Sequence, residues 1–154
     1  MKQRSMVWAL LVGGSIAGAL DILFAISFAA CNGTGPVELL QTVASGALGK
    51  AAFDGGVPTA ALGLLLHFLL SYSWAGAFLL AAVRMSALVR RSMVSGIVFG
   101  IAVFLLMRLV VLPLSAFPFP VKFRPLASIL DLLSHMFFFG VPIALATRRA
   151  LSTR

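Results

Sequence analysis

The chain has 154 residues, of which 61% are hydrophobic and only 10% are charged, and its net charge is +8. A soluble domain carries roughly a quarter charged residues, so this composition excludes an ordinary soluble domain and predicts a single all-α membrane domain spanning residues 1–154. The basic residues lie mostly at the ends of apolar runs and form no stretch that could follow a phosphate backbone, so no nucleic-acid partner is expected.

Four apolar stretches are long enough to cross the roughly 30 Å hydrocarbon core of a bilayer as helices. In chain order they are residues 7–30, 59–83, 93–114 and 126–146. The first has a rival interpretation as a signal peptide, because residues 28–31 (FAAC) resemble a lipoprotein cleavage box. The apolar run is longer than a usual signal sequence and Asp21 interrupts it, which favours a retained span.

Residues 31–57 are too polar to span, and Pro36 suits the first turn of a short helix. The apolar face is predicted to hold Val37, Leu40, Ala44, Ala47, Leu48 and Ala51, and the polar face Glu38, Gln41, Ser45 and Gly49. This pattern predicts a helix lying in the outer interface, ended by Gly55 and Gly56, with Pro58 opening the second span. A re-entrant helix is the alternative.

The loop from residue 115 to 125 contains three prolines, which deny it regular hydrogen bonding and keep it extended. Its phenylalanines are expected at the level of the lipid headgroups. They are Phe117, Phe119 and Phe123.

Charge asymmetry predicts the topology. Eight basic residues lie on one side of the spans, namely Lys2, Arg4, Arg84, Arg90, Arg91, Arg148, Arg149 and Arg154. The other side has Lys50, Lys122 and Arg124. Because cytoplasmic loops are enriched in Lys and Arg, both termini are predicted to be cytoplasmic, in a bacterial inner membrane.

The spans alternate in pattern and predict an internal duplication. Residues 62–68 (LGLLLHF) align with residues 130–136 (LDLLSHM), which matches His67 with His135. The first and third spans share a G-x-x-x-G pattern, at Gly14 and Gly18 and at Gly96 and Gly100. Two tandem repeats, about 1–84 and 92–154, would each enter from the same side and be related by a pseudo-two-fold axis along the membrane normal.

These features resemble the YagU-like proteins of the bacterial inner membrane. The resemblance covers mostly residues 60–150 and is carried by the glycine-rich third span, its exit through residues 112–114 (LPL), residues 134–136 (SHM), the final Arg148-Arg149 pair and His67. The chain is shorter than that family and differs after the first span. The family has no established reaction, so the resemblance implies an architecture and a compartment, and no activity.

Ionisable groups within a membrane are costly and usually face the bundle interior. Five such residues are expected to converge in the outer half of the bundle as a buried polar cluster: Asp21, His67, Arg108, Asp131 and His135. Arg108 is expected to pair with Asp131 or Asp21, and Asp131 should neighbour His135 four residues later. Gly14, Gly18, Gly96 and Gly100 are expected to be helix-packing positions. Each of these polar residues also has a purely structural interpretation. In that interpretation the acids only form ion pairs, Arg108 snorkels to the membrane surface, and the histidines bond carbonyl groups or serine side chains.

The function predicted from the sequence is that of a membrane protein without enzymatic activity, because no nucleophile–base, H-E-x-x-H, phosphate-loop or di-metal pattern is present. The single cysteine, Cys31, excludes an intrachain disulfide and a cysteine metal cluster, and no catalytic residue, metal or cofactor is expected. One alternative is a small proton-linked transporter or permeation unit. Another is a haem carrier with His67 and His135 as axial ligands. The lipid bilayer is the expected partner, and a second copy or another membrane protein is left open.

Overall fold

The computed structural model describes residues 2–152, which form helices joined by short connections and contain no β-strand. Four helical stretches are long and apolar enough to cross a membrane: Met6–Cys31, Gly56–Arg84, Ser92–Leu114 and Pro125–Leu151. Each contains one of the stretches predicted from the sequence, so the four predicted spans are confirmed. The chain is a multi-pass membrane protein built as a helical bundle.

The first two spans are single α-helices and the last two are composite. The first is α1 (Lys2–Cys31) and the second is α3 (Gly56–Arg84). The third consists of α5 (Ser92–Leu106), the π-helix η2 (Met107–Val111) and α6 (Leu112–Leu114). The fourth consists of α7 (Pro125–Ser134), the π-helix η3 (His135–Gly140) and α8 (Val141–Leu151).

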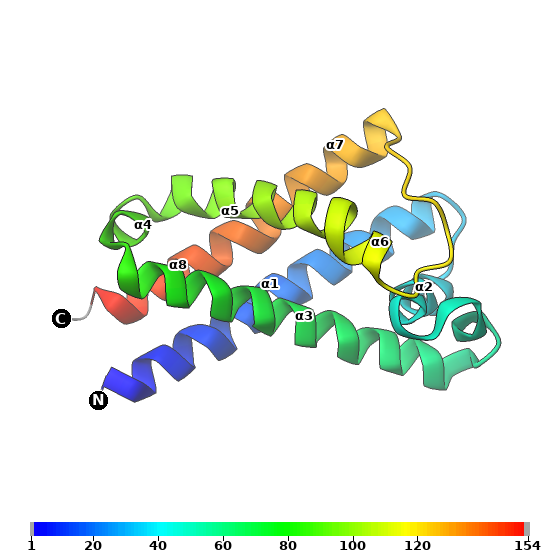
Figure 1. The fold of residues 1–154 in the computed structure, drawn as a ribbon, viewed down its shortest axis with the longest axis horizontal. Helices are drawn as coiled ribbons and strands as arrows, with labels where there is room; N and C mark the ends of the chain where they lie inside the picture. The colour runs from blue at the N-terminus through cyan, green and yellow to red at the C-terminus, as the bar shows by residue number, and fades with distance from the viewer. Residues whose placement is uncertain (1, 153–154) are drawn as a thin grey trace.

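The two ends of the bundle differ. Both ends of the chain lie at one end, together with the short helix α4 (Ser86–Arg90) (Figure 1). At the other end lie α2 (Pro36–Leu48), the 3-10 helix η1 (Gly49–Phe53) and the loop 115–124. Below, these are called the terminal end and the loop end.

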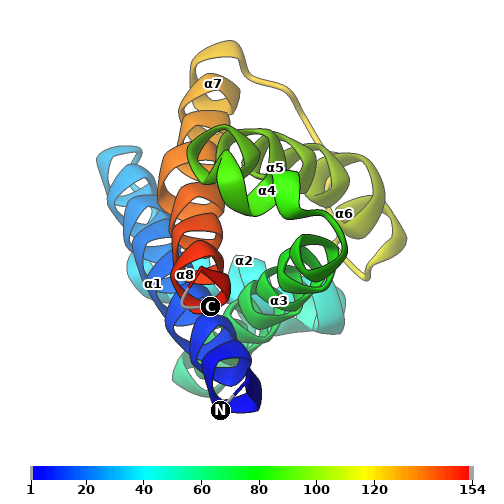
Figure 2. The same cartoon turned by 90° about the vertical axis from the view of Figure 1, so that its left-hand side faces the viewer.

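Close packing is uneven among the spans. α1 packs against both α3 and α8, and α5 packs against η3 and α8. Seen from the terminal end, the ribbons of α3 and α5 stand apart (Figure 2). Side chains bridge them there, because the ring of Phe99 on α5 lies 4.9 Å from the Phe78 ring and 6.4 Å from the Trp74 ring, centroid to centroid. These aromatic residues close the space between α3 and α5 on the terminal side.

Glycines set the separation between α1 and α3. A Cβ atom on Gly14 would meet the ring of Tyr72, and one on Gly18 would meet the ring of Phe68 and the hydroxyl of Ser71. The nearest neighbours of both glycines on α3 are therefore side-chain atoms.

In the second half, glycines meet backbone atoms instead. A Cβ atom on Gly96 would meet the backbone of Val141, and one on Gly100 would meet the carbonyl of His135. Gly140 faces the backbone of both Gly96 and Gly100. The third and fourth spans therefore approach more closely than side chains would allow.

The faces of α2 differ from those predicted. Gln41 and Ser45, expected on an outer polar face, are buried, and Val37 and Leu48 are exposed. The reason is the contact with α3: Gln41 Nε2 donates to the carbonyl of Gly56 at 3.1 Å. Gln41 therefore faces the first turn of α3, whereas Ser45 Oγ donates to the carbonyl of Thr42 within α2.

The limits of α2 also differ from the prediction. It ends at Leu48, before the predicted glycines, and the chain continues as η1. The next span then begins at Gly56, two residues before Pro58. The backbone of α2 crosses α3 at Gly63, where a Cβ atom would overlap the carbonyl of Leu40.

Candidate functional site

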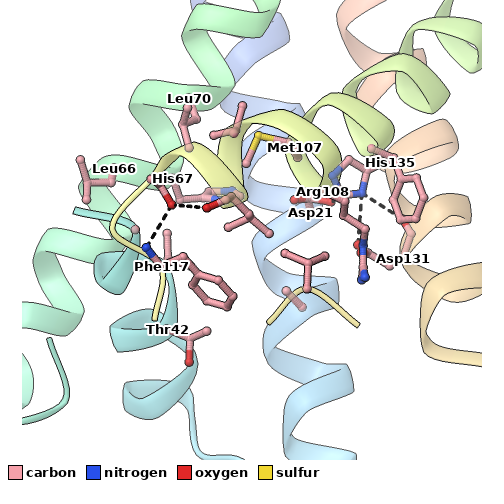
Figure 3. Close-up of a pocket in the computed structure, with 18 of the residues that line it drawn as sticks. Asp21, Thr42, Leu66, His67, Leu70, Met107, Arg108, Phe117, Asp131 and His135 are labelled. Carbon is pink, nitrogen blue, oxygen red and sulfur yellow. Dashed lines mark hydrogen bonds and ion pairs between the residues drawn. The ribbon is translucent and has the colours of Figure 1, made fainter. Parts of the chain in front are cut away.

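A pocket of about 670 Å³ lies in the half of the bundle nearer the loop end. Its walls come from α1, α2, α3, the α5–η2–α6 span, the loop 115–124, α7 and η3. All five polar residues singled out in the sequence line it: Asp21, His67, Arg108, Asp131 and His135. Most of the remaining wall is apolar, including Leu66, Leu70 and Met107 (Figure 3).

Arg108 of η2 is held from several directions. Its Nη2 donates to Asp131 Oδ2 at 2.8 Å and its Nε to the same oxygen at 3.3 Å. Its Nη1 donates to the backbone carbonyl of Lys122 at 3.1 Å. The guanidinium also lies over the rings of Phe104 and Phe123, 5.1 Å and 5.4 Å from their centroids. Arg108 is therefore a fixed part of the wall and pairs with one of its two predicted partners.

His135 lies between two carboxylates. Its Nδ1 is 3.2 Å from Asp131 Oδ1 and 3.9 Å from Asp21 Oδ1, and it also lies 2.9 Å from the backbone carbonyl of Asp131. Each of these neighbours is a hydrogen-bond acceptor, so Nδ1 carries a hydrogen in either charge state of the ring. Ser134 Oγ donates to Asp21 Oδ1 at 3.0 Å and connects α1 to the fourth span.

Asp21, His135, Asp131 and Arg108 thus form one continuous series of contacts, called here the charge network (Figure 3). The expectation of a buried cluster needs correction, because all four side chains keep some exposure, from 15% for Asp21 and His135 to 34% for Asp131. Their exposure is to be expected of groups that form the wall of a pocket.

His67 belongs to the pocket but not to the charge network. Its Nε2 lies 2.9 Å from the carbonyl of Gly18, a hydrogen bond that makes Nε2 the protonated nitrogen. Its ring meets Phe68 edge-on. The predicted convergence therefore holds for four of the five residues, and His67 lies on the opposite wall (Figure 3).

The two π-helices were not foreseen from the sequence. η2 begins one residue before Arg108, and η3 begins at His135. π-helical turns are rare and are frequent at functional sites. Each is followed within two residues by a proline, Pro113 or Pro142, which cannot donate a backbone hydrogen bond. A proline inside an otherwise apolar span is the sequence signal that could have indicated them.

The arrangement suits non-covalent binding and proton transfer. The described part of the chain has no group of three or more His, Cys, Asp or Glu side chains placed to hold a metal ion. The chain matches no family model, no curated protein and no solved structure. The chemistry of the pocket must therefore be inferred from its own residues, which offer carboxylates, imidazoles and a guanidinium around an apolar space.

Proposed function

We propose that this chain is a non-enzymatic protein of the bacterial inner membrane that binds a small molecule in the pocket at its loop end. One observation carries the proposal: polar residues from all four spans line one cavity of about 670 Å³. Small-molecule sites in proteins are concave, mostly apolar and fitted with a few polar groups that fix orientation. An ion-pair network with a purely structural role would not need a cavity beside it.

The pocket proposal can be tested by cysteine accessibility in a Cys31→Ser background. Thr42 lines the pocket, while Glu38, one turn earlier on α2, is exposed. A small cationic thiosulfonate added from the loop side should label both Thr42→Cys and Glu38→Cys. A bulky maleimide should label only Glu38→Cys. Absence of labelling at Thr42→Cys by the small reagent would contradict an open pocket.

We propose further that the terminal end faces the cytoplasm. The basic residues of α4 and of the last turns of α8 gather there with the chain ends, as the positive-inside rule requires. Cys31 is exposed at the opposite end of α1 and offers a natural probe. A membrane-impermeant maleimide should label it in spheroplasts, and should not label Ser86→Cys, an exposed position in α4, in a Cys31→Ser background. The reverse result would invert the topology.

We also propose that the two halves are tandem repeats in a protein that resembles the YagU-like proteins, with α2 as an interfacial helix after the first span. The support is a shared register. The first glycine of the G-x-x-x-G pattern lies against Tyr72 in the first half, and against Gly140 and Val141 in the second, five or six positions after the histidine. The second glycine lies against Phe68 and Ser71 in the first half, and against His135 and Met136 in the second. Superposition of the halves should place the Cα atoms of His67 and His135 at equal depth.

Proton-linked transport is the second candidate, favoured by His135, which touches two carboxylates. Carboxylates and histidines are the usual proton-relay groups in membrane proteins. Between the charge network and the terminal end, the described spans carry no Asp, Glu, His, Lys or Arg side chain, and the Tyr72 hydroxyl is bonded to Ser15, so a pathway through that half would have to open by helix movement. Reconstituted vesicles containing a pH dye separate the candidates, because a binding protein leaves the internal pH unchanged when a ligand gradient is applied.

A further inference from the structure

We propose that the pocket takes a monovalent organic cation with an apolar body, held by Asp21, in exchange for one proton. This inference rests on the proposed function of the pocket as a small-molecule site and names the class of ligand. It follows from the charges that line the pocket and from their partners.

Six charged or titratable side chains line the pocket, one from each of six segments: Asp21 (α1), His67 (α3), Arg108 (η2), Lys122 (loop), Asp131 (α7) and His135 (η3). The guanidinium of Arg108 is committed to Asp131. Lys122 is exposed, offers its carbonyl to Arg108, and forms no ion pair with an acid in the described residues. His67 hydrogen-bonds Gly18 and neither acid. Of these groups, only His135 comes near Asp21.

Asp21 is the incompletely satisfied member of the network. Its Oδ1 accepts one hydrogen bond, from Ser134, and lies 3.9 Å from His135 Nδ1. Its Oδ2 has no hydrogen-bond partner within residues 2–152, although an ionised carboxylate can accept about four hydrogen bonds. The network therefore has two carboxylates and one committed guanidinium, and one negative charge remains to be offset.

Two species can offset that charge. A proton taken up by His135 or Asp21 neutralises the network from within. A cation that enters the pocket and lies against Asp21 does the same from outside. An unpaired positive or negative charge is costly in a poorly solvating site. The bound proton and the bound cation therefore exclude each other. Binding of the cation therefore expels the proton to water, one for one.

The walls select the kind of cation. A cavity of about 670 Å³ lies in the range of pockets that hold drug-sized ligands. A metal ion would need several ligands converging on one point, and the described residues offer no such group. The rings of Phe104 and Phe117 and the side chains of Leu66 and Met107 instead provide an apolar surface for an organic body.

The test uses the purified full chain in detergent and tetraphenylphosphonium as the probe, with tetraphenylborate as an anion of similar size. Equilibrium dialysis should detect binding of the phosphonium and not of the borate. Its affinity should rise about tenfold per pH unit over the range in which the proton is exchanged. In weakly buffered solution about one proton should be released for each cation bound, as expected for one-for-one linkage.

Two variants test whether Asp21 is the residue that holds the cation. Asp21→Asn, which keeps a hydrogen bond with Ser134 available, should weaken phosphonium binding at least about tenfold and abolish proton release, because the counter-charge is lost. Asp54→Asn is the matched control, since Asp54 is an exposed acid at the same end and does not line the pocket. It should bind as the natural protein does.

The outcomes separate the two proposals. Binding of tetraphenylborate in place of the phosphonium, or phosphonium binding without proton release, would overturn the cation–proton exchange while leaving a binding pocket. Failure to label Thr42→Cys would overturn the pocket itself. Should Asp21→Asn fail to fold, protection of Thr42→Cys by the phosphonium is measured instead. Stronger protection at high pH than at low pH supports exchange, and equal protection contradicts it.

Discussion

In both halves of the bundle, a span with a G-x-x-x-G pattern packs against a span that carries a histidine, but the contacts differ in kind. In the first half, α3 sends polar side chains to the backbone of α1: His67 Nε2 to the carbonyl of Gly18 at 2.9 Å, and Ser71 Oγ to the carbonyl of Gly14 at 2.7 Å. Glycines expose those carbonyls because they carry no side chain. His67 and Ser71 therefore hold α1 and α3 together.

In the second half, glycines bring backbone against backbone. Gly140 faces Gly96 and Gly100, and no polar side chain is needed at that contact. His135, which aligns with His67 in the sequence, is left free to meet Asp131 and Asp21 beside the pocket. Where glycines bring the backbones of two helices into contact, no histidine is needed to hold the helices together. The histidine can then take part in a site.

The first prediction concerns the backbone contact between the third and fourth spans. Gly100→Ala would place a Cβ atom against the carbonyl of His135, which cannot yield without moving the helix. We expect a loss of about 3 kcal/mol, the upper end for overpacking. Gly14→Ala meets the ring of Tyr72, an intermediate-exposure side chain that can turn, and should cost about 1 kcal/mol. Unfolding of the purified variants in detergent measures both, and equal losses would contradict the distinction.

The second prediction concerns the charge network of the second half. Arg108→Leu leaves Asp131 without its cation and should destabilise the protein by about 2 kcal/mol, less than the 3–5 kcal/mol of a fully buried pair because both side chains are partly exposed. The double variant Arg108→Leu/Asp131→Leu should recover most of that loss.

Phosphonium binding then separates a structural role from a functional one. If the network only holds the bundle, the stable double variant should bind tetraphenylphosphonium as the natural protein does. If the network sets the properties of Asp21 and His135, the double variant should fold and bind with altered pH dependence. A double variant no more stable than Arg108→Leu would contradict pairing as the source of stability.

The sequence predicts the spans well because apolar length is a local property of the chain. It also predicts that Arg108 pairs with Asp131 or Asp21, since an unpaired charge at membrane depth is costly, and it predicts the Asp131–His135 contact, since residues four apart on a helix are neighbours. The predicted apolar and polar faces of α2 were wrong, because the spacing of residues within α2 does not show that the first turn of α3 lies beside Gln41. The spacing of residues along the spans also could not show that His67 lies outside the charge network. That depends on whether the glycines of the neighbouring span meet side chains, as in the first half, or backbone, as in the second.

The last prediction tests the side-chain to backbone bonds of the first half, where the smallest effects are expected. Hydrogen bonds between membrane helices average about 0.6 kcal/mol, because the separated helices also find polar partners. Ser71 is buried and bonds the carbonyl of Gly14, whereas the Tyr72 hydroxyl bonds Ser15 at 2.9 Å in a partly buried place. Ser71→Ala should therefore cost about 1 kcal/mol, since it leaves a buried carbonyl with fewer partners, and Tyr72→Phe about 0.5 kcal/mol. Both are measured by the same unfolding assay in detergent. If Tyr72→Phe proved the more costly, the stability of the α1–α3 contact would reside in the hydroxyl pair and not in the carbonyls that the glycines expose, and the contrast between the two halves would fail at that point.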